Sequence, residues 1–331
     1  INNIPIIVMS STRNFIKAFT AGADDFLLKP INQYELLLRI HLNIKVAKIA
    51  SEVQLQNQLL EQQKEEVTIQ RDRIFQHQKD LEDDMNYART IQNAIFPQAS
   101  SFQEFCDSLF IYNRPKNIVS GDFYFVAQKN DCYIFALGDC TGHGISGALM
   151  TIAGTAFLND IINNHDILTA DLILNELRIQ VIKLLHQKGE IGEASNGMDI
   201  SLCIFNKETN TIQYAGANNP MYIKRLHNNE LEIIKADRMP IGFHINYKIP
   251  FSKQEIDINK GDIIYMFSDG YADQFGGPFG KKFRYLQFQK LLLSNSKYSL
   301  QHQLQTIDKT MTDWMHLNEQ VDDILVIGIK F

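Results

Sequence analysis

The chain has 331 residues, of which 45% are hydrophobic and 21% are charged, and its formal net charge at pH 7 is −6. This composition predicts a globular protein of about two domains with a large core. The acidic balance without any basic block excludes a nucleic-acid partner, and no apolar run approaches the roughly 20 residues of a bilayer span, so no membrane is expected. The four cysteines form no CxxC pair, which favours a reducing, cytoplasmic location.

Residues 1–40 alternate between strand and helix patterns. "IPIIVMSS" and "DDFLLKP" are short apolar runs typical of buried strands, and "TRNFIKAFTAGA" between them predicts a helix. A second helix is expected to begin after Asn32, a plausible N-cap. This order indicates part of a parallel α/β sheet, which is too short to be a domain by itself.

This segment resembles the C-terminal part of a response-regulator receiver domain. The resemblance places Ser10 at the switch hydroxyl position, Phe26 at the switch aromatic and Lys29 at the phosphate-pairing lysine. It also implies a cis bond between Lys29 and Pro30, an upstream sensor kinase as partner, and a phospho-accepting aspartate before residue 1.

Residues 41–96 predict a long coiled-coil linker. Every seventh residue is apolar over eight repeats: Val46, Val53, Leu60, Val67, Ile74, Leu81, Ala88 and Ile95. The second seam position is polar in its middle: Gln56, Gln63, Gln70, His77 and Asp84. An amphipathic helix on a domain surface is the alternative, but the regularity favours a parallel coiled coil and hence a homodimer.

Residues 97–331 are long enough for one further domain. Strand-like runs are interleaved with paired helical stretches at about 145–164 and 170–188, and again at about 282–294 and 300–316. Runs of strands between pairs of helices predict an α+β fold.

Acidic side chains in this third segment lie beside the ends of apparently buried strands: Asp122, Asp139, Asp269, Asp322 and Asp323. Ionised carboxylates in such places need partners, and no Arg or Lys recurs beside them. An all-oxygen set without a His or Cys cluster favours Mg²⁺ or Mn²⁺. Two such ions can activate a water for hydrolysis of a phosphate ester.

The motifs "SGDFY", "GDCTGHGISGALM", "GANNPMYI", "MPIG", "GDIIYMFSDGYADQ" and "DDILVIGI" stand in this order along the chain. Together with "YARTIQNAIFPQ" upstream, they resemble the SpoIIE-type serine phosphatases of the metal-dependent (PPM, protein phosphatase 2C-like) class over about residues 85–331. The resemblance implies an αββα β-sandwich with a site for two Mn²⁺ or Mg²⁺ ions. It implies these ligands: Asp122 and Asp269 as terminal ligands, Asp139 as the bridging ligand, the backbone carbonyl of Cys140, and Asp322, with Asp323 as the second choice.

Two positions depart from the family pattern. Phe125 stands where many members carry a second aspartate, so no ligand is expected there. Thr141 stands where distant relatives carry a proton-donating histidine, and His143 follows two residues later. His143 is a candidate general acid, although a hydrogen-bonding residue of the glycine-rich turn is the favoured interpretation. Asp199 and Asp273 are weaker candidates for places near the metals.

The combined expectation is a two-component output protein. A phosphoserine or phosphothreonine protein would be the substrate, with an anti-sigma-factor antagonist as the candidate, and Asp122, Asp139 and His143 would serve catalysis. Two alternatives stay open: a catalytically silent scaffold of the same fold, and a hydrolase of small phosphate esters.

Overall fold

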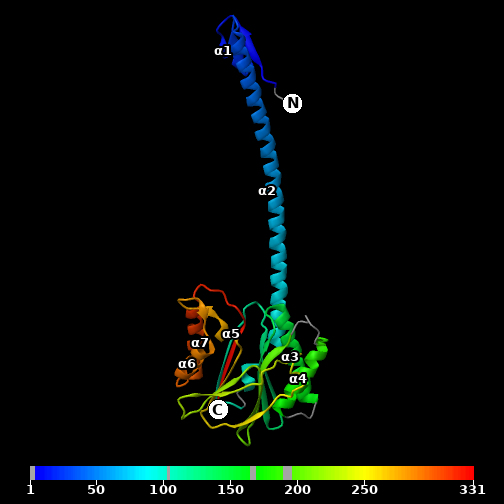
Figure 1. The fold of residues 1–331 in the computed structure, drawn as a ribbon, viewed down its shortest axis with the longest axis vertical. Coiled ribbons are helices and arrows are strands. Elements are labelled where there is room, and N and C mark those ends of the chain that lie inside the picture. The colour runs from blue at the N-terminus through cyan, green and yellow to red at the C-terminus, as the bar shows by residue number, and fades with distance from the viewer. Residues whose placement is uncertain (1–3, 103–104, 165–168, 189–195) are drawn as a thin grey trace. The chain divides into compact units, whose positions relative to one another are not determined.

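The computed structural model describes residues 4–102, 105–164, 169–188 and 196–331, and the chain divides into two compact units between Leu81 and Glu82 (Figure 1). This division falls inside helix α2 (Gln33–Ile95), which contributes to both units. The α+β class expected from the sequence is confirmed, and the long helix is present.

The first unit contains two parallel strands, β1 (Ile7–Ser10) and β2 (Asp25–Leu28), joined by helix α1 (Phe15–Thr20). Arg39 of α2 forms an ion pair with Asp25, with 2.7 Å between Nη1 and Oδ1. The bond between Lys29 and Pro30 is cis, as expected. The strand and helix order is the predicted one, while the assignment to a receiver domain stays a prediction.

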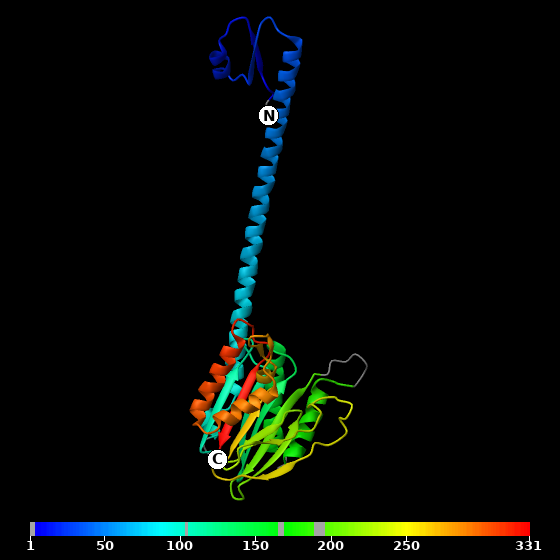
Figure 2. The same ribbon diagram turned by 60° about the vertical axis from the view of Figure 1, so that its left-hand side comes forward.

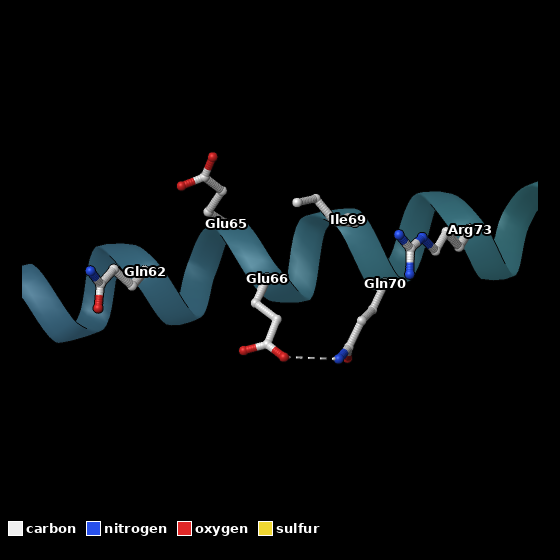
Figure 3. A pocket seen from close by; sticks show the side chains of 6 residues that line it. All are labelled: Gln62, Glu65, Glu66, Ile69, Gln70 and Arg73. Atoms are coloured by element: carbon white, nitrogen blue, oxygen red, sulfur yellow. Dashed lines mark hydrogen bonds between the residues drawn. The ribbon is translucent and has the colours of Figure 1, made fainter.

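Helix α2 is solvent-exposed over most of its length. Of its 63 residues, Gln92 is the buried one among those described. The predicted apolar seam is exposed between 48% and 66% at these positions: Val46, Val53, Leu60, Val67, Ile74 and Leu81. At the polar seam position Gln70, Nε2 donates to Glu66 Oε1 one turn earlier, at 3.4 Å (Figure 3). The side chain at this seam position is therefore bonded to another residue of the same helix.

The second unit is built on two five-stranded antiparallel sheets. The first has the order β10 (Gln254–Asp257), β7 (Thr211–Ala217), β6 (Met198–Asn206), β5 (Cys132–Cys140) and β4 (Asp122–Lys129). The second has the order β3 (Ser108–Arg114), β14 (Ile324–Lys330), β11 (Ile263–Phe267), β8 (Met221–Lys224) and β9 (Leu231–Ile234). Alternating apolar residues on facing strands form the core between the two sheets.

Two pairs of helices cover the outer faces of the sheets (Figures 1 and 2). Helices α3 (Ile145–Asn164) and α4 (Ala170–Leu184) share a core with the first sheet. Helices α6 (Tyr285–Asn295) and α7 (Leu300–Met315) share another with the second sheet. The unit thus has four layers in the order helices, sheet, sheet, helices.

Helix α3 is apolar enough and long enough to cross a membrane by length and composition, with a mean hydropathy of 1.4, contrary to the expectation that no apolar run approaches a bilayer span. Its buried side includes Leu158, Ile161 and Ile162, which pack into the core beside the first sheet. The same apolarity is therefore explained by packing in a globular domain.

Several short elements were absent from the sequence prediction. Strand β3 forms an edge of the second sheet, paired with β14 over its whole length. The others are the 3₁₀ turn η1 (Ala99–Phe102), helix α5 (Gly270–Asp273) and the hairpin strands β12 (Phe275–Gly276) and β13 (Lys281–Lys282).

Candidate active site

Three aspartates lie side by side at one end of the first sheet. The strand register pairs Asp122 of β4 with Asp139 of β5, and Asp139 with Asp199 of β6. Directly opposed residues on antiparallel strands project from the same face. Asp199 was a weak candidate in the sequence, because nothing there showed which residue of β5 it would face.

The second sheet contributes carboxylates from the ends of two neighbouring strands. Asp269 follows β11 and begins helix α5, and its side chain makes no capping hydrogen bond. Burial raises the pKa of Asp269 to about 6, with further contributions from the negative charges of Asp273, Asp322 and Asp199. The charges of both sheets therefore act on one another across the same end of the unit.

Asp122 is the most deeply buried of these carboxyl groups. Its side chain is 1% exposed, and its Oδ2 atom has no hydrogen-bond partner among the described residues. Burial raises its pKa well above the usual value, and the Ser268 hydroxyl opposes that shift. Burial likewise raises the pKa of Asp139, and the charges of Asp122 and Asp269 add to the effect. Burial and mutual repulsion thus raise the pKa values of these carboxylates, opposed by the Ser268 hydroxyl at Asp122 and by the Lys282 charge at Asp269.

This arrangement fits hard divalent cations by its donor chemistry. Every side-chain donor in the group is a carboxylate oxygen, and one of them is a buried oxygen without a partner. Within the described parts of the chain, no three His, Cys, Asp or Glu side chains already stand close enough to enclose an ion. The charges of Asp122, Asp139 and Asp269 nevertheless act on one another, so these carboxylates belong to one electrostatic group.

The structure separates the roles of Asp322 and Asp323. Both oxygens of Asp323 accept backbone N–H groups, Oδ1 from Lys116 at 2.6 Å and Oδ2 from Gly121 at 2.7 Å. Asp323 therefore holds the segment that leads into Asp122. Asp322 accepts the N–H of Asp323 at 2.9 Å through Oδ1, and its charge acts on Asp122, Asp139 and Asp269. Of the two carboxylates, Asp323 is the one whose oxygens both accept backbone N–H groups, although the charges of both act on Asp122.

The glycine-rich turn after β5 brings the chain back against the segment before Asp122. Gly142 has a φ of +91°, which favours glycine. A Cβ atom at Gly147 would lie 2.7 Å from Cα of Gly121, so the start of α3 approaches that backbone too closely for a side chain. The turn also places the Cys140 carbonyl beside Gly121, since a Cβ there would lie 3.4 Å from that oxygen.

His143 lies at the surface between two polar partners. The Lys116 ammonium donates to Nε2 at 2.8 Å, and Nδ1 lies 2.9 Å from Asn117 Oδ1. Because an ammonium group only donates, this pairing fixes Nδ1 as the protonated nitrogen. The contacts agree with the favoured interpretation of His143 as a residue that stabilises the turn.

The other candidate positions are also placed. Phe125 is buried in the core beside α3 and α4. Asp273 forms an ion pair with Lys282 at 2.7 Å. Asn218 has a φ of +56° and donates from Nδ2 to Asp199 Oδ1 at 2.9 Å, so it lies beside the carboxylates of the first sheet.

Gln92 is a residue of the site that the sequence did not reveal. Its Nε2 donates to the Ser120 carbonyl at 2.6 Å and to Thr151 Oγ1 at 2.9 Å, while its Oε1 accepts the N–H of Ser120 at 3.0 Å. The Ser120 hydroxyl in turn accepts the N–H of Asp122 at 3.0 Å. The last turns of α2 are thus bound to the residue that precedes Gly121 and Asp122.

Comparison with known proteins identifies the family. The profile of the family described as Stage II sporulation protein E (SpoIIE) matches residues 129–331. The chain belongs to the SpoIIE family. No curated protein sequence matched this member of the family.

Solved structures show the same fold for this SpoIIE family member. The SiaA-PP2C domain of Pseudomonas aeruginosa is 27% identical with a TM-score of 0.68, covering 77% of this chain and 97% of that domain. The PP2C phosphatase domain with a regulatory fragment of SpoIIE from Bacillus subtilis is 16% identical with a TM-score of 0.54, covering 68% of this chain and 63% of that one. The RsbU and RsbW domains of Rv1364c from Mycobacterium tuberculosis are 16% identical with a TM-score of 0.53, covering 67% and 59%. The chain is therefore related to PP2C-type protein phosphatases.

Proposed function

We propose that this chain is a metal-dependent protein serine/threonine phosphatase. The observation that carries the proposal is the gathering of Asp122, Asp139, Asp269 and Asp322 at one end of both sheets, with an unpartnered buried oxygen on Asp122. Membership of the SpoIIE family supports the reaction class.

Two Mn²⁺ or Mg²⁺ ions would be held by Asp122, Asp139, Asp269, Asp322 and the carbonyl of Cys140. When bound, such ions supply the positive charge that activates a water and neutralises phosphoryl oxygens. The protein itself orients the ligands: Asp139 lies between Asp122 and Asp199 in the register of the sheet, which suits a bridging position. Asp323 and Ser120 fix the backbone on either side of Gly121.

The proposed substrate is a phosphoserine or phosphothreonine protein, with an anti-sigma-factor antagonist as the candidate class. The alternatives differ in what they need from the carboxylates. A silent scaffold has no use for a buried, unpaired Asp122, which destabilises the fold for no gain. A hydrolase of small phosphate esters would use the same carboxylates, and a comparison of phosphoprotein with free nucleotide as substrate separates the two.

The regulation that we propose runs through α2. Its exposed apolar seam would pair with that of a second copy to form a parallel coiled-coil dimer. A sensor kinase acting on the receiver would change that packing, and the hydrogen bonds of Gln92 connect the end of the same helix to the segment before Asp122.

The location proposed is the cytoplasm, in keeping with the four free cysteines.

The decisive experiment is Mn²⁺-dependent hydrolysis of a phosphoserine protein by the full chain, with Asp139→Asn beside it. The variant should lose at least about 100-fold in kcat, since it removes a charge from the centre of the site. Asp131→Asn is the matched control, because Asp131 lies in the exposed turn at the other end of the same β4–β5 hairpin. Equal activity of wild type and Asp139→Asn would overturn the proposal.

A further inference from the structure

The two segments that adjoin Asp273 and Asp322 carry exposed apolar side chains that the carboxylates do not explain. Four of them form what we call the hairpin patch: Phe275 and Phe279 of the β12–β13 hairpin, and Leu317 and Val321 of the segment between α7 and β14. Phe279 is 81% exposed and Leu317 is 89% exposed. Large apolar side chains that gather at a surface mark places of interaction.

The two segments of the hairpin patch are tied together by one buried residue. The Oε1 atom of Gln274 accepts the N–H of Val321 at 3.1 Å, and its Nε2 donates to the Glu319 carbonyl at 2.9 Å. The Gln274 carbonyl accepts Nε1–H of Trp314 at 3.1 Å. The hairpin and the 316–321 segment therefore form one supported surface.

Trp314 supports the hairpin through a backbone hydrogen bond and through its ring. Its carbonyl accepts the N–H of Gly277 at 2.8 Å, and its ring meets Phe283 edge to face with 5.2 Å between centroids. A Cβ atom at Gly277 would lie 2.5 Å from the indole, so the hairpin rests directly on that ring. The hairpin that carries the exposed phenylalanines is thus packed against Trp314.

The hairpin patch is continuous with the carboxylate site. Val321 directly precedes Asp322, and Lys282 of the hairpin binds Asp273, whose charge acts on Asp269. A partner that touches these side chains therefore contacts the same two segments that carry Asp273 and Asp322.

We propose that the hairpin patch binds apolar side chains next to the phosphoserine of the protein substrate and so sets sequence preference. This inference rests on the proposed phosphatase function. A second copy of the chain is the less suitable occupant, because it would cover the rim of the site. Four exposed side chains are also far fewer than the about 20–30 residues per side of a stable interface, which suits a substrate that must leave after turnover.

The test compares two phosphoserine peptides that differ only in the residues flanking the phosphoserine, which are leucine in one and serine in the other. With wild type and Mn²⁺, the leucine peptide should have a KM about tenfold lower, with similar kcat. The double variant Phe279→Ser, Leu317→Ser should lose that preference. Ile245→Ser is the matched control, since Ile245 is 88% exposed on a different loop, and it should keep the preference.

Both variants should melt at the wild-type temperature, because the substituted side chains are exposed. Equal KM values for the two peptides with wild type, or a preference retained by the double variant, would overturn the inference. Fluorescence anisotropy of the same labelled peptides measures binding independently of turnover. If wild type hydrolyses neither peptide nor p-nitrophenyl phosphate, the phosphatase proposal fails, while the anisotropy difference between the peptides still decides about the hairpin patch.

Discussion

Helix α2 and the second unit differ in where their apolar side chains lie: those of the second unit are mostly buried, and those of α2 are mostly exposed. The second unit closes three cores around two sheets within one chain. Helix α2 keeps its regular apolar seam in solvent and has Gln92 as its buried residue among those described. The comparison teaches that the second unit buries its apolar side chains within one chain, whereas the seam of α2 would be buried only in the coiled-coil dimer that we propose.

The largest expected effect is the thermal stabilisation of the second unit when Mn²⁺ binds to its buried carboxylates. Saturating Mn²⁺ should raise its melting temperature by roughly 5–10 °C, since a ligand at about 100 times its Kd stabilises by about 2.7 kcal/mol. Calorimetry of the full chain with and without a chelator measures this shift. Asp122→Asn should remove most of it, and a shift of wild-type size in that variant would contradict the proposed ligand set.

A smaller loss is expected at the junction between α2 and the second unit. Gln92→Ala leaves the buried N–H and carbonyl of Ser120 without partners and should destabilise the unit by about 1–3 kcal/mol. Asn93→Ala, at the exposed neighbouring position, should change stability by less than about 0.5 kcal/mol.

Stability alone does not show that Gln92 positions the site. Isothermal titration with Mn²⁺ should therefore show weaker binding in Gln92→Ala than in Asn93→Ala. Unchanged Mn²⁺ affinity would leave Gln92 as a packing residue and would refute a connection from α2 to Asp122.

The burial of Asp122 predicts that Asp122→Asn is more stable than wild type when no metal is bound. Without divalent cations, Asp122→Asn should unfold at a higher temperature than wild type, by roughly 2–4 °C for about 1 kcal/mol, because it removes a buried carboxylate that has one oxygen without a hydrogen-bond partner and whose ionised form burial disfavours. Thermal melting in chelator checks it, with Asp131→Asn as control. A lower melting temperature for Asp122→Asn would mean that the carboxylate is satisfied by groups of the protein.

The sequence revealed the parts of the site that follow from strand ends. Asp122, Asp139 and Asp269 each adjoin an apolar run, so their place beside a buried strand could be predicted. The pairing of Asp139 with Asp199 could not, because it depends on the register between β5 and β6. The choice between Asp322 and Asp323 depends on which backbone N–H groups lie nearby, and those come from residues about 200 positions away.

Elements without a periodic signal were also missed. Strand β3 contains Asn113 and Arg114 and is recognised only through its pairing with β14. Gln92 looks like any polar residue of a helix, and its importance comes from Ser120 and Thr151. Local pattern predicts an element, whereas long-range contacts decide what a single polar side chain does.

The smallest expected effect is a change in dimerisation affinity caused by a substitution in the middle of α2. Gln70→Leu places an apolar side chain at a polar seam position and should tighten dimerisation by about threefold, because polar seam residues weaken coiled coils. Gln62→Leu makes the same substitution eight residues earlier, at a position that belongs to neither seam series of the heptad pattern, and should leave dimerisation unchanged. Sedimentation equilibrium of the full chain measures both. Equal tightening by the two variants would indicate unspecific hydrophobic association, while no change in either would show that the α2 seam does not pair in this register.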